Sequence, residues 1–133
     1  MKKILCIVLI LMMVIGSFSS VSAIGNMQRR QVVQSLYGTY LSWGAVTSSH
    51  YYCNPGDRYA GSVTYIDKAG TVKIQVYKVG NSKPLAEKTV NGPFDDDIGE
   101  SIGIDVTVAG YYYVKITNTS SGTLVIDGSV LHD

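Results

Sequence analysis

The chain has 133 residues, the length of a single domain, and a formal net charge of +1 at pH 7. Its 11 Lys and Arg residues are nearly balanced by 10 Asp and Glu residues. This balance gives no electrostatic basis for binding nucleic acid or anionic lipid, because both partners require a clustered excess of basic groups. We therefore expect no nucleic-acid partner.

The first 23 residues have the pattern of a secretory signal peptide. Lys2 and Lys3 supply a basic start, residues 4–18 form a mostly apolar run, and residues 21–23 (Val-Ser-Ala) are a loose form of the A-x-A cleavage pattern. The segment looks like a Gram-positive bacterial export signal. We expect a signal-peptide helix that meets the membrane only during export, cleavage after Ala23, and a secreted, extracellular product. The alternatives are an uncleaved anchor, for which the run is short, and a lipoprotein.

The remaining residues, 24–133, form one domain with the composition of a β protein. Removal of Lys2 and Lys3 makes the formal charge slightly negative, and only Cys53 remains, so no disulfide can form within the domain. We expect Cys53 to be buried as a small apolar side chain, with a bridge between two chains as the alternative. All 10 tyrosines lie in this part of the chain, where Tyr, Val, Thr, Ile and Gly are typical of strands and turns.

Alternation of apolar and polar residues predicts six strands, over residues 59–66, 71–79, 85–90, 101–108, 111–117 and 123–131. Residues 67–70 are interpreted as a turn, and residues 80–84 and 91–97 as loops. Residues 27–40 fit a short helix, whereas residues 39–46 fit a further strand. The fold class predicted for residues 24–133 is therefore an all-β, antiparallel, jelly-roll-like β-sandwich of about seven to eight strands.

The same alternation predicts which side chains face the core. The inward set, which lies on the six predicted strands, is Val72, Ile74, Val76, Ile102, Ile104, Val106, Val108, Tyr112, Val114, Ile116, Leu124, Ile126 and Val130.

Residues 109–130 read AGYYYVKITNTSSGTLVIDGSV, in which a tight turn, a strand, a polar hairpin and a last strand follow one another. This arrangement, extending over residues 71–130, resembles the C-terminal half of small bacterial extracellular jelly-roll modules. Pre-peptidase C-terminal domains and several carbohydrate-binding β-sandwiches are similar to it. The resemblance implies a binding module of the same fold, and it transfers no site residue position by position.

Outward-facing tyrosines are the main candidates for ligand binding. If Tyr112 points inward, Tyr111 and Tyr113 point outward beside Lys115, and Tyr77 lies on the matching face of another strand. Such rings, interleaved with polar groups, can stack on sugar rings or form a protein interface. The alternative is cross-strand pairing that only stabilises the sheet. A second aromatic group with the same two interpretations consists of Trp43, Tyr51 and Tyr52.

Two groups of residues are candidate metal ligands. Asp95, Asp96, Asp97 and Glu100 are the densest carboxylates in the chain, and calcium takes several oxygen ligands from loops of this kind. The alternative is a solvated acidic loop.

His50 and Cys53 form an H-x-x-C pair that could contribute to a zinc site, although a structural zinc needs four ligands and His132 is the one other histidine. The turn at residues 54–57 explains the same local composition without a metal.

The leading functional hypothesis is a secreted, non-enzymatic β-sandwich that binds an extracellular or cell-surface carbohydrate or protein. No cofactor is expected, with calcium as a candidate ion. The second hypothesis is a small secreted effector, namely a toxin, an antimicrobial protein or a protease inhibitor. The third is a hydrolase that uses Cys53 as nucleophile with His50. The sequence specifies neither the ligand nor the oligomeric state.

Overall fold

A computed structural model describes residues 31–133, and the signal peptide, its cleavage point and residues 27–30 lie outside this range. Within it the elements are β1 (Gln31–Leu41), β2 (Gly44–Thr47), β3 (Tyr51–Cys53), β4 (Arg58–Lys78), β5 (Ala86–Asp105), β6 (Gly110–Asn118) and β7 (Leu124–His132). The described residues contain no apolar helix of the length needed to cross a membrane. The prediction of an all-β fold with about seven strands is confirmed.

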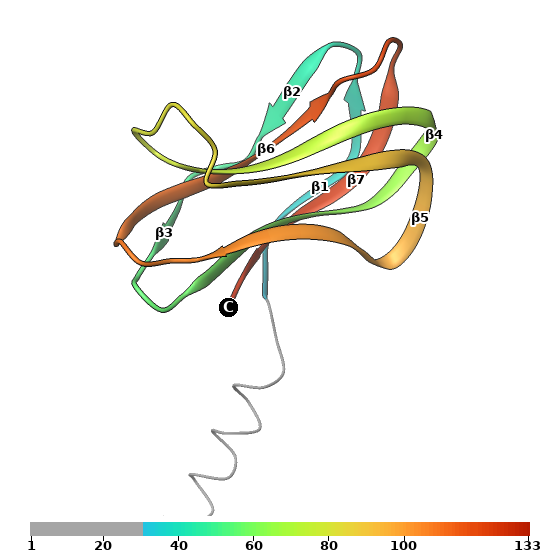
Figure 1. Ribbon diagram of the computed structural model, residues 1–133. Helices are drawn as coiled ribbons and strands as arrows, with labels where there is room; N and C mark the ends of the chain where they lie inside the picture. The colour runs from blue at the N-terminus through green and yellow to red at the C-terminus, as the bar shows by residue number, and fades with distance from the viewer. Residues whose placement is uncertain (1–30) are drawn as a thin grey trace, which may run out of the picture.

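A single antiparallel sheet curls over itself to make both layers of the sandwich (Figure 1). The first half of β4 pairs with β7, and its second half pairs with β6. Strand β5 follows β4 along nearly its whole length. We call the two layers the β7 layer (β1, β7, the first half of β4 and the second half of β5) and the β6 layer (β2, β3, β6, the second half of β4 and the first half of β5).

The passage from one layer to the other depends on two glycines that face each other across the β4–β5 pair. Gly70 is in register with Gly92, next to a register shift that lies between Ile66 and Gly70. A Cβ atom at Gly92 would overlap the backbone carbonyl of Lys68, and one at Gly70 would lie 2.8 Å from Leu124 Cδ2. The missing side chains therefore allow both strands to bend sharply at the same point.

The core lies between the layers, and the alternation in the sequence predicted most of it. The inward-facing residues Val72, Ile74, Val76, Val106, Tyr112, Val114, Ile116, Leu124, Ile126 and Val130 are all buried. Ile102 and Ile104 are partly buried and pack against this core. Val108 was predicted to face inward but is 58% exposed, because β5 ends at Asp105 and the alternation no longer applies beyond it.

Two predictions about the elements were wrong, and a choice left open between helix and strand is decided in favour of a strand. Residues 67–70 are not a turn between strands, and residues 91–97 are not a loop, since both segments lie within the long strands β4 and β5. The single glycine in each segment, Gly70 and Gly92, lets the strand bend without ending it. The short helix considered for residues 27–40 is replaced by strand β1 from Gln31 onward, because pairing with β7 along its length satisfies its backbone groups.

We predict that Gly92→Ala destabilises the fold far more than Gly110→Ala. At Gly92 the added methyl meets backbone, whereas at Gly110 it meets only the flexible end of the Lys78 side chain, at 3.1 Å. Overpacking of this kind costs about 1–3 kcal/mol of unfolding free energy. Urea denaturation of the two variants gives the comparison, and equal midpoints would show that the bend does not need a glycine at position 92.

Candidate functional site

Strands β3, β4 and β6 place a group of aromatic rings on the outer side of the β6 layer. Tyr77 of β4 is in register with Tyr113 of β6, and Tyr52 of β3 is in register with Tyr111 of β6. Since residues two apart on a strand share a face, Tyr111 and Tyr113 lie on the same side. We call the group of Tyr52, Tyr77, Tyr111, Tyr113 and His50 the tyrosine face.

The rings of the tyrosine face contact one another across the strands. Tyr77 and Tyr113 are stacked, with ring centroids 5.1 Å apart and planes 5° from parallel. His50 stacks on Tyr113 at 5.3 Å. Tyr52 and Tyr111 form an edge-to-face pair, also at 5.3 Å. Contacts of this kind between neighbouring rings restrict the orientations that each side chain can take.

Two tyrosines of this face are about half exposed, and His50 is exposed as well. Tyr111 is 54% exposed and Tyr52 is 50% exposed, so their mutual contact leaves about half of each side chain in water.

Polar side chains border the stacked rings. The Tyr77 hydroxyl donates to Gln75 Oε1 at 3.3 Å, and Gln75 Nε2 donates to Glu87 Oε2 at 3.0 Å. Lys115 is in register with Gln75 on the neighbouring strand. The tyrosine face therefore combines aromatic surface with donors and acceptors on the same side of the sheet.

The structure brings together the tyrosines that the sequence analysis selected. Tyr77 and Tyr113 are in direct contact, Tyr111 lies two residues before Tyr113, and Lys115 lies two residues after it on β6. Their role in ligand binding stays a prediction.

Sequence reasoning missed His50 as a member of the face and placed Tyr52 in a separate group. That group is divided, because Tyr51 turns inward against Tyr59 and Trp43 is 92% exposed between β1 and β2. Alternation along residues 50–53 was the signal that could have shown which of these side chains point outward.

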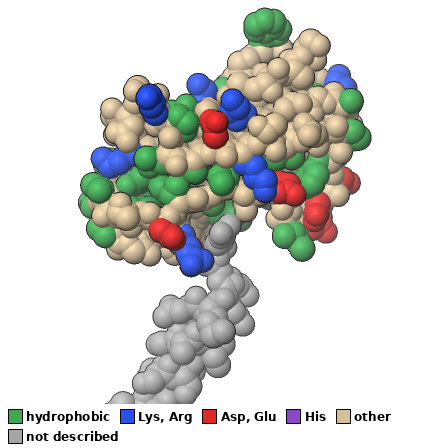
Figure 2. All heavy atoms as spheres, viewed as in Figure 1, with side chains coloured by type: hydrophobic (Ala, Val, Ile, Leu, Met, Phe, Trp, Pro, Cys, Tyr) green, Lys and Arg blue, Asp and Glu red, His purple; other side chains and the backbone are tan. Residues whose placement is uncertain are grey.

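The predicted calcium ligands lie where β5 bends. The carboxylates of Asp95, Asp96 and Asp97 are exposed, and acidic side chains gather at that end of the molecule (Figure 2). Asp96 Oδ1 accepts a hydrogen bond from the Ile98 amide at 3.0 Å, and Glu100 forms an ion pair with Lys88. Two of the four carboxylates, those of Asp96 and Glu100, are thus engaged with protein groups, and calcium binding stays a prediction.

The H-x-x-C pair does not form a site. His50 is exposed and stacks on Tyr113, whereas Cys53 is fully buried as a free thiol. Residues three apart on an extended chain point to opposite faces, so neither the zinc pair nor the nucleophile pair predicted for these two residues is present. The burial predicted for Cys53 is confirmed.

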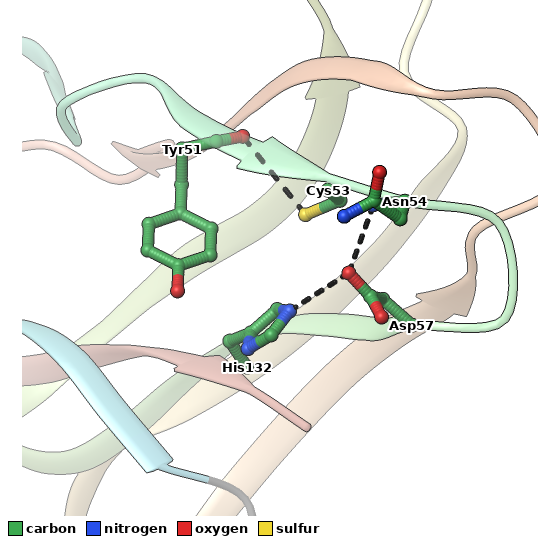
Figure 3. A network of polar contacts seen from close by, with 5 residues as sticks. All are labelled: Tyr51, Cys53, Asn54, Asp57 and His132. Atoms are coloured by element: carbon green, nitrogen blue, oxygen red, sulfur yellow. Dashed lines mark hydrogen bonds and ion pairs between the residues drawn. The ribbon is translucent and has the colours of Figure 1, made fainter.

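Cys53 instead faces Asp57 and His132, as Figure 3 shows. Within residues 31–133 these three are the one group of potential metal ligands whose donor atoms lie within 4.8 Å of one another.

Burial raises the pKa of the Cys53 thiol to about 11, with a smaller contribution from the negative charge of Asp57. The pKa of Asp57 is lowered, first by the backbone hydrogen bond from Asn54 and then by the hydrogen bond from His132. A thiol that is buried and protonated at neutral pH is a poor nucleophile. This environment argues against a catalytic role for Cys53 in its present state.

Comparisons with known proteins identify no family for this chain. No family model matches the sequence, and no curated protein matches it. Among solved structures, a CBM4 carbohydrate-binding module has 11% identity and a TM-score of 0.48, with 78% of each chain covered. A CBM61 module in complex with β-1,4-galactotriose has 13% identity and a TM-score of 0.46, covering 72% of this chain and 68% of the module.

A Bacillus endospore appendage, a disulfide-linked pilus, has 16% identity and a TM-score of 0.43, covering 79% of this chain and 89% of the other. Carbohydrate-binding β-sandwiches are thus among the structures that this chain resembles, as the sequence resemblance implied. Because sandwiches of this kind serve different functions, the function must be argued from the residues of this chain.

We predict that Cys53 resists alkylation by iodoacetamide at pH 8 while the protein is folded. Relative to the ordinary value of 9.0, a pKa of about 11 reduces the reactive thiolate roughly a hundredfold, and burial reduces access further. The rate is measured by mapping the Cys53 peptide in native and guanidinium-denatured protein. Equal rates in the two states would contradict the burial of this thiol.

The same shift predicts a loss of stability at alkaline pH. Because the folded state holds the thiol proton more tightly than the unfolded state, the stabilisation is complete below about pH 9 and declines as the pH rises toward about 11. Urea midpoints measured between pH 8 and pH 11 should fall less in Cys53→Ala than in the natural protein. A parallel fall in the two proteins would remove Cys53 as the cause.

Proposed function

We propose that this chain is a secreted, non-catalytic β-sandwich that binds carbohydrate through the tyrosine face. The observation that carries the proposal is the pair of half-exposed rings, Tyr52 and Tyr111, held in contact beside a fixed stack of aromatic rings.

Sheet stability alone does not account for these rings. Cross-strand pairing is already supplied by Tyr77 and Tyr113, which are only partly exposed. Tyr52 and Tyr111 leave apolar ring surface in water, and this surface gains free energy when a ligand covers it.

The neighbouring polar groups favour a sugar as the ligand. The apolar C–H face of a sugar ring packs on an aromatic ring, while its hydroxyls need donors and acceptors at the edge of the contact. The amide of Gln75, the carboxylate of Glu87 and the ammonium of Lys115 supply both kinds of group close to the rings.

We predict that Tyr111→Ala and Tyr52→Ala each weaken binding of a glycan by about tenfold, because loss of one aromatic contact costs roughly 1.4 kcal/mol. A glycan array selects the ligand, and isothermal titration calorimetry measures the affinity of each variant. The matched control is Tyr37→Ala, which removes a 64% exposed ring from β1 in the other layer. Its affinity should equal that of the natural protein.

Two outcomes would overturn this proposal. One is the absence of binding to every glycan on the array, and the other is equal affinity for the Tyr111→Ala variant and the natural protein. Capture of a protein partner that is lost in the same variants would assign the tyrosine face to a protein interface. Growth inhibition of other bacteria by the purified protein, unchanged in Tyr111→Ala, would favour the effector hypothesis.

Export is part of the proposal and rests on the signal-peptide pattern of residues 1–23. Expression of the full chain in a Gram-positive host should yield a protein in the medium whose first residue is Ile24, as determined by intact mass. Retention of the full-length chain in the cell fraction would contradict both export and the cleavage point.

A further inference from the structure

A cluster of three different metal-ligating side chains lies at one end of the sandwich, and its buried member, Cys53, directly follows Tyr52 of the tyrosine face on β3. Cys53 ends β3, His132 ends β7, and Asp57 directly precedes β4. Figure 3 shows the thiol, the imidazole and the carboxylate pointing toward one another. Segments far apart in the sequence are thus brought to one point by the pairing of β7 with β4 and of β3 with β6.

From this arrangement we propose that Cys53, Asp57 and His132 bind a divalent zinc-class ion as a three-ligand site. Sulfur, imidazole nitrogen and carboxylate oxygen are the ligands that zinc takes in proteins. The thiolate and the carboxylate together neutralise the two positive charges of the ion, and the neutral imidazole completes the set. As the ion binds, the S–H bond of Cys53 breaks and its proton passes to solvent, while the proton on His132 Nε2 is exchanged through solvent for one on Nδ1, so that the sulfur and Nε2 can both bond to the metal.

The distances are close to those that a metal site requires. Zinc bonds of about 2.0–2.3 Å place tetrahedral ligand atoms about 3.3–3.8 Å apart. The donor atoms of the three residues lie within 4.8 Å of one another, and His132 Nε2 is 3.0 Å from Asp57 Oδ2. Binding therefore needs the thiol to move in by about 1 Å and the His132–Asp57 pair to open slightly, both within reach of side-chain rotation.

Neighbouring groups already orient two of the ligands. The backbone N–H of Asn54 donates to Asp57 Oδ2 at 2.8 Å. The Tyr51 ring packs against the His132 imidazole, with ring centroids 4.9 Å apart. Two backbone hydrogen bonds of 3.0 Å between Arg58 and Asp133 fix the end of β7 against β4. Support of this kind around the ligands is what holds a metal site in shape.

The site leaves a position for an exchangeable ligand. Cys53 is fully buried, whereas the side chains of His132 and Asp57 are 21% and 27% exposed. An ion held by all three would therefore be reached by water from the His132–Asp57 side, which gives the open fourth position of a three-ligand zinc site.

Titration with Co²⁺ tests this proposal, because bonding of a thiolate to Co²⁺ produces a charge-transfer absorption band in the near ultraviolet. The protein is first stripped with a chelator and carries Cys6→Ser, so that Cys53 is its one thiol. We expect one equivalent of Co²⁺ to produce the band and Zn²⁺ to abolish it by displacement. We also expect Zn²⁺ to raise the melting temperature, since a ligand that binds only the folded state stabilises it.

Variants distinguish the proposed ligands from the alternative metal site, the H-x-x-C pair of His50 and Cys53. Cys53→Ser should abolish the band, and His132→Ala and Asp57→Asn should weaken Co²⁺ binding at least tenfold, with circular dichroism showing that the fold is kept. Cys53 is buried, so its replacement can destabilise the core. His132 and Asp57 are partly exposed, and His132→Ala and Asp57→Asn therefore keep the test decisive. His50→Ala is the matched control, since His50 stacks on Tyr113 outside the cluster, and it should bind Co²⁺ unchanged.

The proposal is overturned if folded protein gives no thiolate–Co²⁺ band at millimolar Co²⁺, or if the band persists at full affinity in His132→Ala. Loss of the band in His50→Ala would overturn it as well, by assigning the metal to the H-x-x-C pair. Carbohydrate binding is tested separately by Tyr111→Ala and Tyr52→Ala, so the two proposals can fail independently.

Discussion

The structure depends on one bend in a pair of strands. Gly70 and Gly92 face each other across β4 and β5, and neither position has room for a Cβ atom without a close contact. A continuous sheet can therefore turn through the bend and cover its own apolar face. Without the bend the same pairing would give one broad sheet whose apolar face stays in water, and most of the buried area that stabilises the domain would be lost.

The bend also determines what the outer surfaces can do. Once the sheet has folded, alternate residues on β6 point in opposite directions: Tyr112 lies in the core and is 2% exposed, whereas Tyr111 is 54% exposed. The β3 segment repeats this division, with Tyr52 outside and Cys53 inside. The inward side chains supply stability, and the outward side chains form the tyrosine face. The same strands therefore contribute to both, and the side of the sheet on which a residue lies decides its role.

The sequence predicted the parts of the fold that follow from short-range alternation, and failed where long-range pairing decides. Val114, Ile116, Leu124 and Ile126 were placed inward because strict alternation leaves no other choice, and each is fully buried. The Gly and Asp residues near position 70 suggested a turn, because the same residue types serve a bend and a turn, and only the pairing of β4 with β5 distinguishes them. Likewise Cys53 was paired with His50, its neighbour in sequence, whereas the partner it meets is His132, far along the chain.

The two candidate sites also differ in how far the sequence could predict them. The tyrosines of β4 and β6 could be selected from the alternation of inward and outward residues along each strand. Their stacking across strands, however, depends on the register of Tyr77 with Tyr113. The cluster of Cys53, Asp57 and His132 could not be derived from spacing, because it joins the ends of two strands and a turn. Two of its members, His132 and Asp57, are joined directly by a contact of 3.0 Å between Nε2 and Oδ2.

The central claim is that the outer side of the β6 layer is the carbohydrate-binding surface. The most direct measurement is a titration of ¹⁵N-labelled protein with soluble chito-oligosaccharides, cello-oligosaccharides and peptidoglycan fragments, followed by ¹H–¹⁵N correlation spectra. The account predicts that one of these series shifts the amide signals of Tyr52, Tyr111 and Tyr113 while those of β1 and β7 stay in place. Shifts that cluster on β1 and β7, or no shift with any of the sugars, would contradict it.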